Sequence, residues 1–338
     1  MPNFISEDQI EKAAVALLTE TYGYRTANCY TQDVENLADR SNRASKQDVV
    51  LFDVLKAFAV KLNQGLPETV VEEAIEKLTA RRYAMSPILA NKDVYGLIRN
   101  GIPVEYEGAN GKTEHGMVRV IDFANPQNND FCAVTQLWIK GERYPRRPDI
   151  LIYVNGLPLV FIELKNSNVK VQNAYEDNLT NYKRDIPLLF QYNAFCVLSN
   201  ALETRVGSFT AGHEFFFNWL RSDDETEKVN RKEIEKEGAS LERVLHGLFP
   251  KERLLDYIGN FILYHKDTNK IVAQNHQFLG VNKAIVSFEA RDNKNGKLGV
   301  FWHTQGSGKS FSMIFLSRKI FHKYPGNYTF VIVTDRED

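Results

Sequence analysis

The stretch RPDILIYVNGLPLVFIELK, residues 147–165, decides the fold of this chain. It contains two apolar runs rich in β-branched and aromatic residues, Ile150–Val154 and Leu157–Leu164, and each run predicts a strand. Asn155-Gly156 separates the runs, and this dipeptide is among the strongest signals for a tight β-hairpin turn. The sequence therefore predicts a buried hairpin at the centre of the fold.

Acidic side chains and a lysine lie at the open end of this hairpin. Asp149 precedes the first strand, while Glu163 and Lys165 end the second, two residues apart and therefore on one strand face. A plain two-residue turn would pair Asp149 with Ile162 and direct Glu163 to the opposite face. If the two carboxylates act together in one site, the hairpin must contain an odd-numbered loop or a β-bulge, which would place both on one face beside Lys165.

Phosphodiester cleavage would explain these residue types. It requires a hard cation held by oxygen ligands, which Asp149 and Glu163 can supply together with the backbone carbonyl of Leu164. The cation polarises the phosphate and lowers the pKa of a bound water, while Lys165 can orient that water and stabilise developing negative charge. The alternative is that these charges are simply solvated hairpin ends, and the spacing alone leaves this open.

The composition fits a globular chain without membrane or secretion signals. The 338 residues leave room for about two or three domains, and a formal net charge of -1 neither requires nor excludes a nucleic-acid partner. Cys29, Cys132 and Cys196 are far apart and lack CxxC spacing, so neither a disulfide framework nor a zinc site is expected. No secretion leader and no apolar run of about 18 residues occurs, so a cytoplasmic location is expected.

Periodicity predicts helices and strands on both sides of the hairpin. The first helix should cover residues 6–21, with Ser6 as N-cap and a buried stripe of Ile10, Ala13, Ala14, Leu17 and Leu18. Residues 31–100 look mostly helical, and helices are expected over 49–62, 67–78 and 170–183. Strands are expected over 117–123, 130–139 and 193–199. Core positions, rather than a base-stacking platform, are expected for Phe215, Phe216, Phe217 and Trp219.

Asp223–Glu237, DDETEKVNRKEIEKE, is the clearest change of composition, because it is highly charged and almost without apolar residues. It predicts a solvated helix or linker and hence a domain boundary. We expect a first domain over residues 1–222, a charged linker over 223–250 and a second domain over 251–338. The second domain should contain helices over 251–265, 274–289 and 311–324 and strands over 299–304 and 328–334.

The second domain contains GSGKS, residues 306–310, between an expected strand and an expected helix. This order is the context of a phosphate-binding loop. Gly306 and Gly308 let the backbone approach a phosphate, Lys309 can reach the β- and γ-phosphates, and Ser310 can hold Mg²⁺. His303 occupies the first glycine position of the strict pattern, and a chance Gly/Ser turn is the alternative.

WHTQGSGKS, residues 302–310, resembles motif I of the restriction (motor) subunit of type I restriction-modification enzymes, where this loop opens a superfamily 2 helicase-like motor. NHQFLGVNKAI, residues 275–285, resembles the family's adenine-recognising glutamine motif. VTDRED, residues 333–338, resembles the start of the next helicase motif. The resemblance implies ATP contacts from Gln277, Thr304, Gln305, Gly306, Ser307, Gly308, Lys309 and Ser310.

Upstream, Pro148-Asp149 and Glu163-Leu164-Lys165 fit the pattern of the PD-(D/E)xK nucleases, and type I restriction subunits are similar in carrying such a nuclease before the motor. In that family a glutamine and a tyrosine four residues apart follow on a helix. Asn178 and Tyr182 are the match here, and asparagine is one methylene shorter than glutamine. Glu11 matches the acidic residue of the family's first helix, whereas its position on the helix flank alone would favour a solvated glutamate.

The predicted fold is therefore an α/β PD-(D/E)xK nuclease domain with a mixed central sheet, followed by the start of a RecA-like P-loop helicase domain. The resemblance implies Mg²⁺-dependent cleavage of double-stranded DNA, coupled to ATP-driven translocation. The implied partners are specificity and methyltransferase subunits. The chain stops inside a helicase motif and resembles the N-terminal piece of such a subunit, so we expect no ATP turnover by this chain alone.

Two other interpretations stay open. Another nuclease–helicase fusion, from DNA repair or a type III restriction enzyme, would combine the same motifs, although type III enzymes are expected to carry the nuclease after the motor. A non-catalytic scaffold that binds DNA or nucleotide would carry the carboxylates as structural groups.

Overall fold

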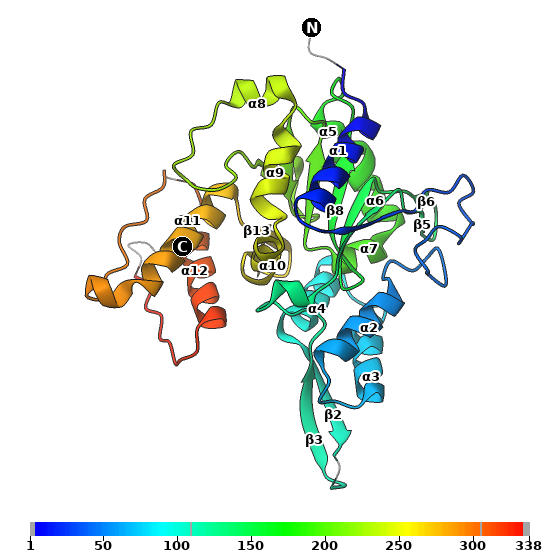
Figure 1. Ribbon diagram of the computed structural model, residues 1–338, viewed down its shortest axis with the longest axis horizontal. Helices are drawn as coiled ribbons and strands as arrows, with labels where there is room; N and C mark the ends of the chain where they lie inside the picture. Colours follow the sequence, from blue (N-terminus) through cyan, green and yellow to red (C-terminus); the bar gives the residue numbers. More distant parts are fainter. Residues whose placement is uncertain (1–3, 109, 305, 334–338) are drawn as a thin grey trace.

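A seven-stranded mixed sheet forms the centre of the computed structural model, which describes residues 4–108, 110–304 and 306–333 (Figure 1). Its spatial order is β1 (Arg25–Asn28), β4 (Phe131–Thr135), β7 (Ile150–Val154), β8 (Leu157–Leu164), β9 (Phe195–Ser199), β10 (Thr204–Gly207) and β11 (Phe217–Asn218). β1 is parallel to β4 and β8 is parallel to β9, whereas the other neighbours are antiparallel. The expected mixed sheet is confirmed.

The predicted hairpin is β7–β8, and it contains the β-bulge that the carboxylates require. Asn155 and Gly156 have φ angles of 47° and 80°, as in a two-residue type I′ turn. Ile152 pairs with Val160 but the next residue pairs with Pro158, so Leu159 is left without a partner. Beyond the pair Ile150–Ile162, this register places Asp149 opposite Glu163.

The closed end of the hairpin is locked into its surroundings. The buried side chain of Asn155 donates to the carbonyl of Val120 and to Oδ1 of Asn129, both at 2.8 Å. Gly156 accepts a hydrogen bond from the backbone N–H of Leu51 at 2.9 Å. A Cβ at Gly156 would lie 2.4 Å from the carbonyl oxygen of Leu51, so only glycine fits this turn.

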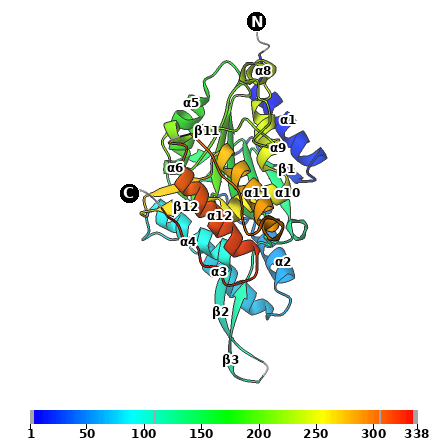
Figure 2. The same cartoon turned by 90° about the vertical axis from the view of Figure 1, so that its left-hand side faces the viewer.

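Helices cover both faces of the sheet, and β7 and β8 are therefore buried throughout. α1 (Glu7–Glu20) and α9 (Ser240–Leu248) lie over one face (Figure 2). The other face is covered by α5 (Val171–Asn173), the π-helical η2 (Ala174–Leu179), α6 (Thr180–Asp185) and α7 (Pro187–Tyr192). Ser6 caps α1 in a capping box with Gln9, and α1 buries Ile10, Ala14 and Leu18. Ala13 is exposed, so its predicted core position is wrong.

Residues 31–51 contain no helix, and the expectation of a mostly helical region is wrong there. The helices that follow are α2 (Phe52–Leu62), α3 (Glu68–Thr79) and α4 (Pro87–Asn100). Ion pairs hold the preceding loop instead, since buried Asp39 lies 3.0 Å from Arg43 and 2.6 Å from Lys46. Side-chain pairing of this kind satisfies buried polar groups without secondary structure.

Two predicted strands are only partly right. The strand predicted over 117–123 is formed only up to Val118, as the end of β3 (Thr113–Val118). β3 pairs with β2 (Ile102–Glu107) in a hairpin that projects from the body of the molecule (Figure 1). The predicted strand 130–139 is split into β4 and β5 (Ile139–Lys140), which pairs with β6 (Pro145–Arg146). Phe216 and Trp219 are buried as expected, but Phe215 is 68% exposed and its predicted core position is wrong.

The C-terminal part lies to one side of the sheet (Figure 1). It comprises α8 (Arg231–Glu237), α10 (Lys251–Asn260), β12 (Ile262–His265), β13 (Asn269–Val272), α11 (Asn275–Glu289), η4 (Arg291–Lys294) and α12 (Lys309–Lys323). Two short 3₁₀ helices, η1 (Pro126–Asn128) and η3 (His213–Phe215), occur earlier in the chain. The predicted helix 251–265 is wrong beyond Asn260, because Lys266 and Asp267 have positive φ and turn the chain into a hairpin. Within the described residues, none of the helices is long and apolar enough to cross a membrane.

The two strands predicted beside the phosphate loop are not formed. Residues 299–304 and 328–333 are irregular, and Thr334 lies outside the described residues. Val300 is 94% exposed and Val331 is 82% exposed. Neither segment pairs with another strand in the described part of the chain, and an apolar segment forms a stable strand only when neighbours satisfy its backbone and cover its side chains.

Candidate active site

The two hairpin carboxylates meet at the open end of β7–β8. Asp149 Oδ2 accepts a hydrogen bond of 2.8 Å from the backbone N–H of Leu164. Glu163 is 2% exposed, and its Oε1 accepts a hydrogen bond from the side-chain amide of Asn178. Glu163 Oε2 is buried without a hydrogen-bond partner among the described residues. Such an oxygen is costly to bury unless a ligand satisfies it.

The environment of both carboxylates disfavours negative charge. Burial raises the pKa of Asp149 to about 6, although the Leu164 N–H and the Lys165 charge oppose this shift. Burial also raises the pKa of Glu163, and the nearby charge of Asp149 adds to this effect. A cation between them would favour their ionised forms, so the pair is suited to binding positive charge.

These residues fit a hard divalent cation. Mg²⁺ is commonly bound by one or two carboxylates and keeps several waters, and Asp149 and Glu163 supply that number. The described residues contain no cluster of three or more His, Cys, Asp or Glu side chains able to hold a metal. The remaining ligands would therefore be water or backbone oxygen, and the carbonyl of Leu164 stays a predicted ligand.

Lys165 lies beside Glu163. Its backbone N–H donates to the carbonyl of Ser199 at 2.8 Å, which continues the alignment of β8 with β9. Its Nζ lies 3.7 Å from Glu163 Oε1, and 16% of its side chain is exposed. The lysine therefore lies on the Glu163 side of the hairpin while retaining access to solvent.

Glu11 reaches the same site from α1 through a residue that sequence analysis missed. Gln136 Nε2 donates to Glu11 Oε2 at 2.5 Å and points to Asp149 Oδ1 at 3.4 Å. Gln136 has a φ of 55°, and its backbone N–H donates to the carbonyl of Asp149 at 3.0 Å. This left-handed conformation is uncommon for a residue with a side chain and often marks functional positions. Glu11 therefore belongs to the carboxylate group instead of facing bulk solvent.

A second glutamate of α1 was also missed. Glu7 lies one helical turn before Glu11, and its Oε1 accepts a hydrogen bond of 3.3 Å from the backbone N–H of Asn166. The charge of Glu7 contributes to the raised pKa of both Asp149 and Glu163, after the larger effect of burial. The i, i+4 spacing of the two glutamates on α1 was the available sequence signal.

Asn178 and Tyr182 support the carboxylates from the opposite side of the sheet. Asn178 lies in the π-helical η2 and contacts Glu163. π-helical turns are rare and frequently occur at functional sites. The Tyr182 hydroxyl donates to the carbonyl of Arg147 at 3.2 Å, and its ring packs edge-on against Phe161. Asn178 therefore fixes one carboxylate, and Tyr182 braces the backbone that leads to the other.

The phosphate loop has the backbone geometry that its glycines predict. Gly306 and Gly308 have φ angles of 79° and 75°, and α12 begins directly afterwards at Lys309. Lys309 Nζ donates to the carbonyl of His303 at 3.0 Å, and the Ser310 side chain is exposed. The first N–H groups of α12 have no partners within the helix, which makes its N-terminus a suitable phosphate site.

The remaining predicted nucleotide contacts lie around this loop. Thr304 is exposed, Ser307 is partly buried, and Gln305 lies outside the described residues. Gln277 is 2% exposed, and its Nε2 donates to the carbonyls of Gly308 at 3.0 Å and Ser307 at 3.3 Å. Gln277 thus braces the loop in this structure, and its contact with adenine stays a prediction.

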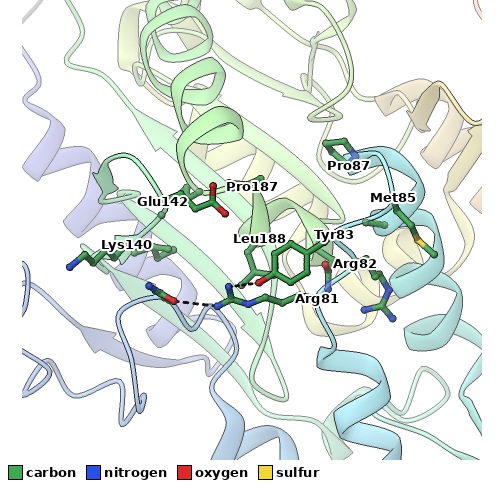
Figure 3. A pocket seen from close by; sticks show the side chains of 15 residues that line it. Arg81, Arg82, Tyr83, Met85, Pro87, Lys140, Glu142, Pro187 and Leu188 are labelled. Atoms are coloured by element: carbon green, nitrogen blue, oxygen red, sulfur yellow. Dashed lines mark hydrogen bonds between the residues drawn. The ribbon is translucent and has the colours of Figure 1, made fainter.

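Several cavities lie outside the carboxylate group. One of about 540 Å³ is lined by Gln277, Gly306 and Gly308 and also by the exposed Phe215. Figure 3 shows another, of about 280 Å³, whose lining includes Arg81, Tyr83, Lys140, Glu142 and Leu188. The Arg81 guanidinium donates to the Tyr83 hydroxyl there at 2.9 Å. None of the predicted site residues lines this second cavity.

Comparisons with known proteins match both parts of the chain. A family model described as the N terminus of type I restriction enzyme R proteins matches residues 4–215, and one described as SWI2/SNF2 ATPase matches residues 276–338. The type I restriction enzyme HindI endonuclease subunit of Haemophilus influenzae is 36% identical over 99% of this chain and 32% of its own length. The putative type I restriction enzyme MjaIXP endonuclease subunit of Methanocaldococcus jannaschii is 29% identical, over 98% of this chain and 33% of its own length. The chain spans about a third of these relatives.

Proposed function

Because the chain belongs to the type I restriction enzyme R protein family, we propose that it carries the Mg²⁺-dependent endonuclease of such an enzyme, acting on double-stranded DNA. One observation carries this proposal. The β-bulge at Leu159 brings Asp149 opposite Glu163, and the unpartnered Oε2 of Glu163 lies in the same carboxylate group. This combination fits a cation-assisted hydrolase, whereas a purely structural hairpin end has no use for a buried unpartnered carboxylate oxygen.

The chain's own residues would divide the work of cleavage. Mg²⁺, when bound, polarises the phosphodiester and lowers the pKa of a bound water. Asp149 and Glu163 would hold the cation, while the Leu164 N–H and the Asn178 amide keep their other oxygens in place. Lys165 would orient the attacking water and stabilise negative charge on the phosphate as the bond to water forms.

The phosphate loop supports a second part of the proposal. Gly306–Ser310 and α12 would bind ATP, with Lys309 at the terminal phosphates and Ser310 on the nucleotide's Mg²⁺. ATP-driven translocation would belong to the complete protein, since this chain spans about a third of its relatives. Specificity and methyltransferase subunits would supply recognition of the DNA site.

The decisive experiment is Lys165→Ala in the complete restriction complex. We expect DNA cleavage to be lost while DNA-stimulated ATPase activity stays intact, because Lys165 lies at the carboxylates and not at the phosphate loop. Lys170→Ala is the matched control, since Lys170 is an exposed lysine five positions away and should tolerate the change. Unchanged cleavage in Lys165→Ala would favour a non-catalytic scaffold.

A further inference from the structure

Two consecutive arginines precede Asp149, and their surroundings differ sharply. Arg146 is paired, because its Nε donates to Asp185 Oδ2 at 2.7 Å and its guanidinium also lies 5.7 Å from the Tyr182 ring centroid. The Arg147 guanidinium has no carboxylate or other hydrogen-bond acceptor in residues 4–108, 110–304 and 306–333. An arginine that keeps its donors unused beside an active site has capacity for a ligand.

Aromatic rings hold the Arg147 side chain in place. Its guanidinium carbon lies 5.0 Å from the ring centroid of Tyr30 and 5.0 Å from that of Trp138. Trp138 is itself fixed, since its indole N–H donates to the carbonyl of Thr31 at 3.0 Å. Stacking on aromatic rings uses the face of a guanidinium and leaves the N–H edge free. The side chain is therefore oriented before any ligand arrives, which lowers the entropic cost of binding.

The position of Arg147 is tied to the carboxylates. Arg147 lies two residues before Asp149, a span of at most about 7 Å along the chain. Its carbonyl accepts the hydrogen bond from Tyr182, so the predicted site residue Tyr182 fixes the backbone of Arg147. A ligand held by Arg147 would thus lie next to a group bound at Asp149.

The site needs cationic groups if its substrate is a polyanion. Glu7, Glu11, Asp149 and Glu163 gather there, and Lys165 is the lysine beside them. This excess of acidic groups repels phosphate at short range wherever they are ionised. An unpaired guanidinium at the edge of the carboxylate group would offset that repulsion where the DNA strand continues past the cleaved bond.

We propose that Arg147 binds a backbone phosphate of the DNA strand adjacent to the phosphate that is cleaved, an assignment that rests on the proposed nuclease function. The planar guanidinium offers two parallel N–H donors to two phosphate oxygens, a geometry that a lysine cannot reproduce. Contacts of this type set the position of the strand without reading bases. Arg147 is therefore a positioning residue, and its partner is any DNA strand rather than a particular sequence.

The test measures binding of this chain to a short fluorescent DNA duplex by anisotropy, without divalent metal, between about 50 and 200 mM NaCl. Arg147→Ala should weaken binding about five- to tenfold at low salt and reduce the slope of log K against log salt by about 0.9, the value for one lost phosphate contact. Arg147→Lys should keep most of the slope but bind more weakly than wild type, because it loses the planar contact.

Arg146→Ala is the matched control for a neighbouring arginine. It should lower the melting temperature, because it leaves buried Asp185 with one partner fewer, while the salt slope stays at the wild-type value. The proposal is overturned if Arg147→Ala keeps the wild-type slope, if Arg146→Ala reduces the slope equally, or if the wild-type chain does not bind the duplex. Failure of the nuclease proposal is separate, since it would appear as unchanged cleavage in Lys165→Ala whatever the behaviour of Arg147.

Discussion

The carboxylate site and the phosphate loop each follow a segment that the sequence predicts as a buried strand, yet only one of these segments is a strand in the structure. β8 is paired on both sides and Glu163 is 2% exposed. Residues 299–304 have no pairing partner in the described part of the chain, and Lys309 and Ser310 are exposed. A local motif thus acquires fixed geometry only where residues distant in sequence complete its sheet.

The largest expected effects concern activity and separate the two regions functionally. In the complete complex, Lys309→Ala should abolish ATPase activity, and DNA cleavage should be lost with it because translocation no longer occurs. Glu163→Gln should reduce cleavage by at least about 100-fold, since several kcal/mol of transition-state stabilisation depend on the bound cation. ATPase and cleavage assays on both variants check this, and loss of ATPase in Glu163→Gln would contradict the separation.

Glycine substitutions should reveal the difference in packing. Gly156 and Gly306 have nearly equal φ angles of 80° and 79°, so alanine meets the same backbone strain at both. A Cβ at Gly156 would also lie 2.4 Å from the Leu51 carbonyl oxygen, whereas nothing lies within 4 Å at Gly306. We expect Gly156→Ala to cost about 3 kcal/mol or more and Gly306→Ala about 1 kcal/mol in the free energy of unfolding. Urea titration of both variants measures this, and equal costs would show that the hairpin turn can adjust.

The buried carboxylates should make the stability of the metal-free protein depend on pH. The pKa of Asp149 is raised to about 6, and that of Glu163 is also raised, so the folded state binds protons more tightly than the unfolded state. The stability that protonated Asp149 contributes is present at about pH 4 and is lost between about pH 4 and 6, by up to roughly 1.4 kcal/mol per pH unit. The raised pKa of Glu163 adds a loss of the same sign as pH rises.

Glu163→Gln tests this pH dependence because it removes one of the charges. In EDTA it should raise the melting temperature at pH 8 and change it less at pH 5. Mg²⁺ should raise the melting temperature of the wild-type chain at pH 8 more than that of the variant. A wild-type protein whose stability is insensitive to both pH and Mg²⁺ would contradict the assignment of a cation site.

The smallest expected effect is on the stability of the phosphate loop. Lys309 is exposed and donates only to the backbone of its own loop, so Lys309→Ala should change the free energy of unfolding by less than about 0.5 kcal/mol. Thermal denaturation of the variant checks this value. A large loss of stability would mean that the loop is as integral to the core as the hairpin.

The hairpin shows how far the sequence alone could go. Apolar runs around Asn155-Gly156 predicted the strands, because they are a local property of the chain. The spacing of Asp149 and Glu163 predicted either an odd-numbered loop or a bulge if the two carboxylates form one site, and the structure has the bulge. Glu11 and Asn178 were found through family resemblance, since their side chains reach the site from separate helices.

The errors and omissions have long-range causes. Gln136 was missed because its role depends on a left-handed backbone conformation that its sequence context does not signal. Arg147 was not singled out, since Tyr30 approaches it from a loop more than a hundred residues away. Strands at 299–304 and 328–334 were predicted from apolar composition, which does not reveal whether a neighbouring strand exists.

The unpaired Leu159 compensates for one extra residue in the length of the hairpin. A regular ladder built on the two-residue turn would pair Asp149 with Ile162, and the residue left out at Leu159 restores the pair with Glu163. Removal of the Leu159 codon would therefore leave a regular ladder in which Asp149 still lies opposite Glu163. A codon inserted into β8 that is not taken up as a further bulge would instead direct the two carboxylates to opposite faces of the sheet. Homologous hairpins can thus be one residue shorter, without a bulge, and keep the carboxylate pair.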